Sequence, residues 1–211
     1  MEHKKIISNY DLQVDIGKKI FLDYDQEMLI RRFGLAADEA WIYLTYMNTP
    51  CRICRKTGRI EEALTENIWS ECRSFNTVMT IYDLLCYPKE KTAPGLSGSW
   101  CPVSKFAVVG GPDASIFSKK YTDLFQDQPE KLKIACKNLG GILKKSLAGA
   151  DVTCQVPATP FFPVLLQFWE GDEEFPPKLM FLWDENSMRF LHFETTYYLQ
   201  NDLLERLIKQ F

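Results

Sequence analysis

The chain has 211 residues, of which 46% are hydrophobic and 25% are charged, and its formal net charge is −3. These values are ordinary for a globular protein and argue against a disordered or fibrous chain. A chain of this length buries roughly 70% of the surface that its unfolded form exposes, so its core needs no disulfide or metal. We expect a single domain over residues 1–211, with a weak sub-boundary near 110–112.

The N-terminal sequence MEHKKIISNYD contains no apolar run of signal-peptide length. No other stretch approaches the ~18 apolar residues that a membrane-spanning helix needs. The seven cysteines are odd in number and irregular in spacing, which favours free thiols in a reducing compartment. The sequence therefore predicts a soluble, cytoplasmic protein without a membrane partner.

Basic residues are dispersed along the chain, mostly as isolated pairs. The densest group consists of Arg52, Arg55, Lys56 and Arg59. We interpret these charges as the solvated face of a hairpin, where they oppose edge-to-edge pairing; a phosphate- or anion-binding patch is the alternative. A nucleic-acid-binding protein usually carries a basic domain or stripe, so no nucleic-acid partner is expected.

In the first half of the chain, apolar spacing predicts a helix over residues 5–22. A second helix begins after Asp25, which can cap it, and ends before Gly34, a favoured residue just after a helix. Aromatic and β-branched residues then predict a small meander with turns at 48–50 and 57–58. Its three strands are expected over residues 40–47, 51–56 and 59–62.

In the second half, a helix is predicted over 77–86 with Asn76 or Thr77 as its cap, followed by a loop over 89–98. Two helices are expected over 115–125 and 129–139. Short connections then favour antiparallel pairing of four strands, over residues 152–156, 164–169, 179–183 and 189–193. A closing helix is expected over residues 195–209. The predicted fold class is α+β, a mainly antiparallel sheet with flanking helices that the C-terminal helix closes.

Cys51 and Cys54 form a Cys-x-x-Cys pattern within an expected strand. Residues three apart in a strand point to opposite faces, so the two sulfurs should not meet. We interpret both as structural thiols, and a zinc or thiol centre at this pair is the alternative.

Histidine occurs only at His3 and His192. His192 is therefore the credible general base, although an exposed histidine in a strand is the simpler interpretation. The sequence contains no nucleophile elbow, phosphate-binding loop, dinucleotide fingerprint or zinc-protease motif.

The most distinctive segment is WEGDEEFPP at 169–177, in which three consecutive acids occupy a turn between two apolar strands. Asp184 ends the next strand, and Glu194 opens the last helix. Carboxylates brought together in this way could bind a divalent cation or form an acid–base pair. The alternative is that Asp172 forms an Asx turn, Glu194 serves its helix, and the other acids are solvated.

The stretch from Phe162 to Leu199 resembles the C-terminal signature of the family called domain of unknown function 3786. The matching positions are Trp169, Gly171, Asp172, Glu174, Phe175, Pro176, Asp184 and Glu194, while Trp183 stands where phenylalanine is more usual. The helix around Thr80–Leu85 and the loop Leu96–Gly98 fit as well. The resemblance implies anaerobic bacteria and some archaea as the source. It also implies an iron–sulfur module in some members, which this chain lacks because its cysteines do not cluster.

These observations favour a non-catalytic, ligand- or protein-binding accessory domain of anaerobic metabolism. The expected ligand-binding residues are Trp169, Asp172, Glu174, Asp184, His192 and Glu194. The alternative is a metal-assisted hydrolase or transferase that uses the carboxylates, with His192 as base, and a third is a zinc or thiol protein centred on Cys51 and Cys54. The sequence identifies no cofactor, and the partner is expected to be a small molecule or a protein.

Overall fold

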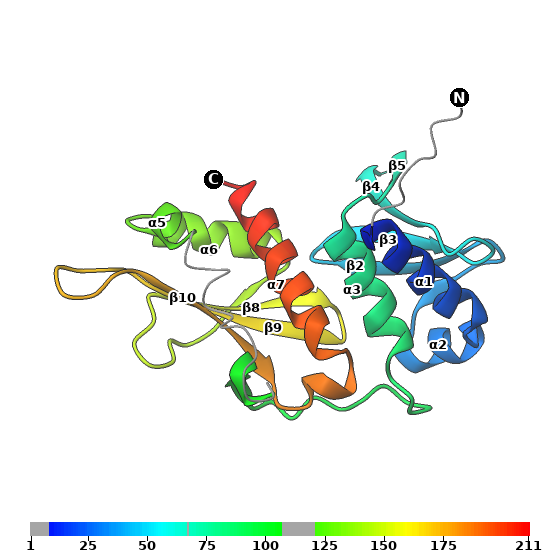
Figure 1. Cartoon of the computed structure of the whole chain (residues 1–211). Coiled ribbons are helices and arrows are strands. Elements are labelled where there is room, and N and C mark those ends of the chain that lie inside the picture. Colours follow the sequence, from blue (N-terminus) through cyan, green and yellow to red (C-terminus); the bar gives the residue numbers. More distant parts are fainter. Residues whose placement is uncertain (1–8, 67, 107–120) are drawn as a thin grey trace.

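The computed structural model describes residues 9–66, 68–106 and 121–211. The fold is α+β, as predicted, with two five-stranded antiparallel sheets and a long C-terminal helix that lies between the two halves of the molecule (Figure 1). The predicted sub-boundary at 110–112 and most of the predicted helix over 115–125 lie outside the described residues. No helix in the described ranges is long and apolar enough to cross a membrane.

The two N-terminal helices are α1 (Asn9–Asp23) and α2 (Gln26–Phe33). The Asp25 side chain accepts a hydrogen bond from the Met28 N–H at 2.9 Å, which confirms the predicted cap of α2. Gly34 follows that helix with φ 62°, a left-handed conformation that glycine adopts at little cost.

The N-terminal sheet is a meander in which each strand pairs with the next. Its strands are β1 (Ala36–Ala37), β2 (Trp41–Tyr46), β3 (Thr49–Cys54), β4 (Ile60–Thr65) and β5 (Ile68–Glu71). The predicted turn at 48–50 is displaced. Met47 and Asn48 form a two-residue turn with φ 44° and 62°, so Thr49 and Pro50 already belong to β3 and pair with β2.

Helix α3 (Phe75–Cys86) is the predicted helix over 77–86, but it begins two residues earlier. Its cap is Ser74, whose hydroxyl accepts the Thr77 N–H at 3.2 Å, so the predicted caps Asn76 and Thr77 were wrong. The loop predicted over 89–98 is confirmed and leads into a short strand, β6 (Trp100–Pro102), that the sequence pattern did not predict.

The C-terminal sheet has the strand order β6-β10-β9-β8-β7. Its strands after β6 are β7 (Ile142–Leu143), β8 (Val152–Thr159), β9 (Phe162–Trp169) and β10 (Lys178–Asp184). The central strand β9 is buried at every residue except Trp169, so it contributes to the core through both faces. In the described segment that leads into β7, the helices are α5 (Thr122–Phe125) and α6 (Pro129–Asn138).

The predicted strand over 189–193 is absent. Ser187–Arg189 forms a single 3₁₀ turn, and α7 (Phe193–Ile208) begins directly after His192. Phe190 and Leu191 are both fully buried, which an alternating strand with one solvated face does not allow. The apolar residues here therefore pack a compact turn under the start of the last helix.

Helix α7 packs against α3 and α6 and is also connected to the N-terminal sheet by polar contacts. The Arg206 guanidinium forms ion pairs with Glu62 at 2.7 Å and Asp202 at 3.1 Å, and donates to the Thr49 hydroxyl at 3.2 Å. The Thr77 hydroxyl donates to Asp202 at 2.6 Å. This network joins the last helix to α3 and to two strands of the N-terminal sheet.

Candidate functional site

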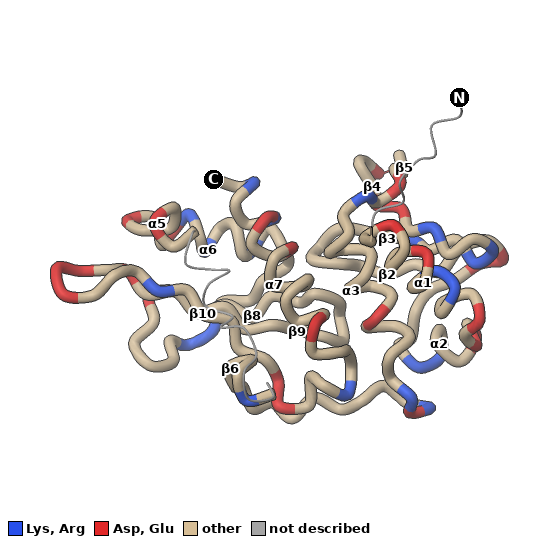
Figure 2. Tube along the Cα trace, in the orientation of Figure 1, with Lys and Arg blue, Asp and Glu red and all other residues tan. Residues whose placement is uncertain are grey.

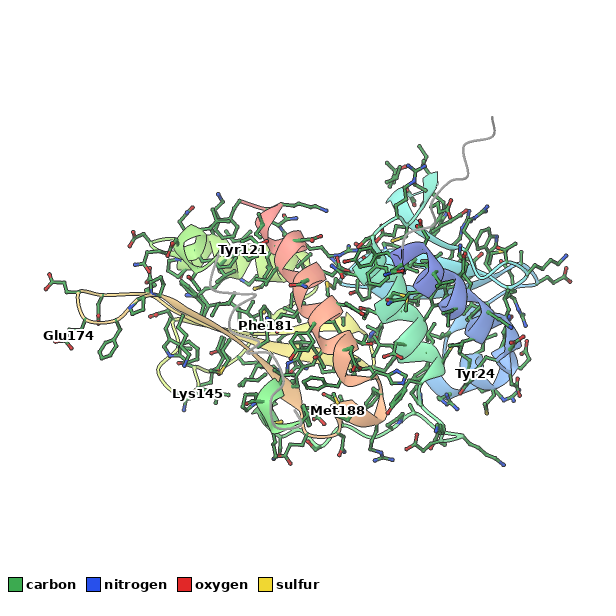
Figure 3. All side chains as sticks on the ribbon, in the orientation of Figure 1. Tyr24, Tyr121, Lys145, Glu174, Phe181 and Met188 are labelled. Atoms are coloured by element: carbon green, nitrogen blue, oxygen red, sulfur yellow. The ribbon has the colours of Figure 1, made fainter. Side chains whose placement is uncertain are left out.

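The structure distributes the predicted ligand-binding residues over three places. Two regions lie at the start of α7 and at the end of β10, and the third is the connection between β9 and β10. Figure 3 shows Glu174 at the tip of this connection, which extends away from the body of the molecule and from Met188, near the start of α7. In the part of the chain that the structure describes, no three histidine, cysteine or acidic side chains are placed to share a metal ion.

The connection between β9 and β10, residues 170–177, is called the acidic loop here. Oδ1 of Asp172 accepts the N–H groups of Glu174 at 2.9 Å and of Phe175 at 2.8 Å, and the Asp172 N–H donates to the Phe175 carbonyl at 2.8 Å. These backbone hydrogen bonds lower the pKa of the Asp172 carboxyl. Asp172 therefore forms the Asx turn that was the structural interpretation of this motif.

The base of the acidic loop is held by contacts with two other segments. The Gly171 N–H donates to the Gln126 side chain at 2.7 Å, and the Gln126 amide donates back to the Gly171 carbonyl at 3.3 Å. The Glu170 N–H donates to Asp151 at 2.8 Å. A Cβ at Gly171 would lie 2.7 Å from the Pro177 ring, so only glycine fits there. The loop is thus fixed at its N-terminal end, where Gly171 also lies close to Pro177.

A groove of about 750 Å³ lies beside the acidic loop. Its apolar wall consists of Trp169, Phe175, Pro176, Pro177 and Leu179. Phe175 is 66% exposed, although it is a large aromatic residue. Asp123, Glu170, Asp172 and Lys178 also line the groove, and acidic residues dominate the tip of the hairpin (Figure 2).

Trp169 is held in place at the mouth of this groove. Its indole N–H donates to the Ala148 carbonyl at 3.0 Å, and the Lys178 ammonium lies 5.2 Å from the ring centroid. Trp169, Asp172 and the acidic loop are therefore brought together, as the sequence motif suggests. Glu174 lies on the same loop and is exposed to solvent.

Asp184 lies at the end of β10 and is 1% exposed. Its carboxylate accepts the N–H groups of Ser97, Gly98 and Asn186 at 2.8–2.9 Å. Burial raises the pKa of this carboxyl, but the backbone hydrogen bonds outweigh burial and the pKa is lowered. Asp184 thus anchors the Leu96–Gly98 loop, and its oxygens are occupied by the protein's own backbone.

His192 is exposed at the start of α7 and bonds to Asp83 of α3, a residue that the sequence reasoning missed. Asp83 accepts the His192 backbone N–H at 2.7 Å and the Thr195 hydroxyl at 2.6 Å, and it contacts the ring nitrogen Nδ1 of His192 at 2.7 Å. The Tyr87 ring lies 4.1 Å from the imidazole centroid. Asp83 is the one acidic residue in the predicted helix over 77–86, and this isolated position could have identified it from the sequence.

A second groove, of about 500 Å³, lies between α1, α3 and the first turns of α7. His192 and Glu194 line it together with Asp83, and none of the acidic-loop residues do. The predicted site residues therefore belong to two separate grooves, one beside the acidic loop and one beside His192, with Asp184 in neither.

Cys51 is buried in β3 and Cys54 is partly exposed at its end, on the opposite face, as strand alternation predicts. Burial raises the pKa of the Cys51 thiol. Burial also acts to raise the pKa of Cys54, but hydrogen bonds from Thr57 and Lys56 and the charge of Arg59 outweigh it, so that pKa is lowered. All seven cysteines are free thiols.

Comparison with known proteins adds one match. No curated protein and no solved structure matches the chain. A family model described as "Domain of unknown function (DUF3786)" matches residues 25–206, which run from the cap of α2 to the arginine that joins α7 to the N-terminal sheet. This range includes the acidic loop, Asp83, Asp184 and His192. The match confirms the resemblance seen in the sequence, and the chain belongs to the DUF3786 family.

Proposed function

We propose that the chain is a protein-binding accessory domain, whose recognition surface is the acidic loop and the groove beside it. The observation that carries this proposal is the presentation of Phe175, which is 66% exposed on a loop with a fixed backbone. Aromatic side chains supply much of the binding energy at protein interfaces. A loop that is already ordered also loses little conformational entropy on binding.

The charges around the groove indicate the chemistry of the partner. Asp172, Glu173 and Glu174 are exposed on the acidic loop, and Asp123 and Glu170 line the groove beside Lys178. Complementary charge increases the association rate and the specificity of an interface. We therefore expect a partner segment with one apolar anchor for the wall of Trp169 and Phe175, flanked by lysine or arginine.

The two enzymatic or metal-binding alternatives receive less support from the geometry. A metal-assisted hydrolase would need the predicted carboxylates in one cleft, whereas Asp172 and Asp184 bond to backbone groups in separate places. A zinc or thiol centre would need Cys51 and Cys54 on one face of β3. The proposal includes the role in anaerobic metabolism that the family resemblance implies. The seven free thiols are compatible with this role.

A phage-displayed random dodecapeptide library, selected on the full chain, tests this proposal. We expect the selected peptides to combine an aromatic or aliphatic anchor with flanking lysine or arginine, and their affinity to fall steeply with ionic strength. The strongest selected peptide is then synthesised, and its Kd is measured by fluorescence anisotropy for the original chain and for variants.

Phe175→Ala should weaken this peptide by roughly tenfold or more, the effect of a typical aromatic hot spot. Leu64→Ala is the matched control, because Leu64 is an equally exposed apolar residue (67%) on the N-terminal sheet. Peptides without basic residues, or equal affinities of the Phe175→Ala and Leu64→Ala variants, would contradict the proposal.

A further inference from the structure

We propose that the groove between α1, α3 and the first turns of α7 is a second binding site, which takes a small apolar carboxylate and holds its charged end between His192 and Lys89. This site shares no lining residue with the groove beside the acidic loop. It therefore stands or falls independently of the protein-binding role proposed above.

The orientation of the His192 ring is fixed from one side. Nδ1 lies 2.7 Å from the Asp83 carboxylate, which also accepts the His192 backbone N–H and the Thr195 hydroxyl. The Asp83 side chain is 14% exposed and His192 is 60% exposed. Because Nδ1 is engaged, Nε2 is the ring nitrogen left for a ligand, and no described residue forms a hydrogen bond to it.

The walls of the groove are largely apolar. On α1, Ile16 and Ile20 are one helical turn apart and are 51% and 49% exposed, so they leave an apolar surface open to solvent. The groove is also lined by Met79 of α3, by Tyr87, which follows α3, and by Tyr198 of α7. A groove of about 500 Å³ with apolar walls and a few polar groups is typical of small-molecule sites.

The charged and titratable groups that face the groove decide the polarity of its ligand. On α3, Asp83 is engaged with three donor groups, and burial raises the pKa of Cys86 to about 12, so its thiol is neutral. On α7, burial raises the pKa of Tyr198, and Glu194 is exposed at the rim. The segment of α1 that lines the groove contributes Gln13 and no charged side chain.

The groups left to meet a ligand's charge are therefore the Nε2 of His192 and the ammonium of Lys89, opposed at the rim by Glu194. A protonated imidazole that bonds to Asp83 through Nδ1 can donate its second N–H to an anion. Hydrogen bonds between ionised partners are shorter and stronger than neutral ones. A carboxylate with an alkyl or aryl body satisfies these donors and covers Ile16 and Ile20.

Isothermal titration calorimetry with octanoate, 1-octanol and octylammonium tests this site, because the three probes share one alkyl chain and differ in charge. We expect octanoate to bind roughly tenfold or more tightly than either of the others. The imidazole NMR signals should report contact at His192, because His3 is the only other histidine and His3→Gln assigns the spectrum.

His192→Gln keeps a hydrogen-bonding side chain without the imidazole, and it should weaken octanoate by about tenfold. Lys89→Met should also weaken octanoate, because it removes the ammonium group that meets the charged end of the ligand. The Phe175→Ala chain should bind octanoate like the original chain, which separates this site from the acidic loop. No octanoate binding, equal affinity for octanol or octylammonium, or unchanged binding by His192→Gln would overturn the proposal.

Discussion

The two sheets have the same number of strands and the same antiparallel pairing, but they are buried differently. In the N-terminal sheet, burial alternates along β2 and β3, so one face packs on the core and the other meets solvent. In the C-terminal sheet, β9 is buried at successive residues on both faces. One sheet is therefore an outer layer of the molecule, and the other forms the middle of its core.

The outer face of the N-terminal sheet is covered by its own polar side chains. The Arg52 guanidinium lies between two tryptophan rings, 3.9 Å from the centroid of Trp41 and 4.4 Å from that of Trp69. Glu61 forms ion pairs with Arg52 at 2.6 Å and with Arg59 at 2.7 Å. Arg52 and Arg59 of the dense basic group are thus paired with an acid and aromatic rings, and charge and stacking replace burial on this face.

The largest effect is expected in the C-terminal sheet, where burial dominates. Phe168 of β9 is fully buried and packs against Phe125 with ring centroids 6.0 Å apart. Phe168→Ala should lower the free energy of unfolding by about 3–5 kcal/mol, because it removes a large apolar side chain and leaves a cavity. Urea denaturation monitored by circular dichroism measures this change, and a loss below about 1 kcal/mol would weaken the contrast between the sheets.

An intermediate effect is expected at Asp184, where the C-terminal sheet holds the Leu96–Gly98 loop. Asp184→Asn should cost about 1–3 kcal/mol at pH 7, because one amide oxygen cannot replace a carboxylate that accepts three N–H groups. The folded-state pKa of Asp184 is lowered. Its contribution is therefore complete above the unfolded value near 3.9 and is lost as the pH falls through the folded value.

The difference in stability between Asp184→Asn and the original chain should accordingly shrink below about pH 4. Urea titrations from neutral pH down to about pH 2.5 check this. A difference that stays constant over the whole range would show that the variant acts through packing and that the charge of Asp184 is not involved.

A smaller effect is expected on the outer face of the N-terminal sheet. Arg52→Lys keeps the charge but loses the planar group between Trp41 and Trp69, so it should cost about 1 kcal/mol. Arg59→Lys is the matched control, because Arg59 is more exposed and lies 5.9 Å from the Trp41 centroid. If both substitutions have equal effects in urea denaturation, stacking does not stabilise this face.

The smallest effect on stability is expected at the acidic loop. Phe175→Ala should change the free energy of unfolding by no more than about 0.5 kcal/mol, because the side chain is exposed and packs little. Thermal denaturation without the peptide checks this small change in stability. The same measurement with the selected peptide checks that Phe175→Ala weakens peptide binding. A large loss of stability without the peptide would show that Phe175 is part of the fold, in contradiction to its role in recognition.

Much of the fold could be predicted from local patterns. The α2 boundaries follow from Asp25 and Gly34, and the three long strands β8, β9 and β10 of the C-terminal sheet follow from apolar runs between turn residues. The missed strands β1, β5, β6 and β7 have only two to four residues, and they are defined by their pairing partners. Residues 189–193 were misread because buried neighbours in a compact turn give the same apolar composition as a strand.

The candidate site could be predicted only in part. The acidic loop was found because its residues are consecutive, and the Asx turn of Asp172 follows from them. The pairing of His192 with Asp83 joins residues 109 apart, and the anchoring of Ser97 by Asp184 joins residues 87 apart. A single sequence contains no information on such tertiary contacts. The prediction therefore placed residues of two separate grooves on one surface.

The position of Arg206 has a consequence for the order of folding. During synthesis, Glu62 of β4 leaves the ribosome 144 residues before the arginine that neutralises it, and Thr49 leaves 157 residues before it. These contacts of β3 and β4 can form only once α7 has been synthesised, and contacts of such long range slow folding. We therefore propose that residues 1–211 complete folding as one cooperative unit, in which this last helix secures the first sheet.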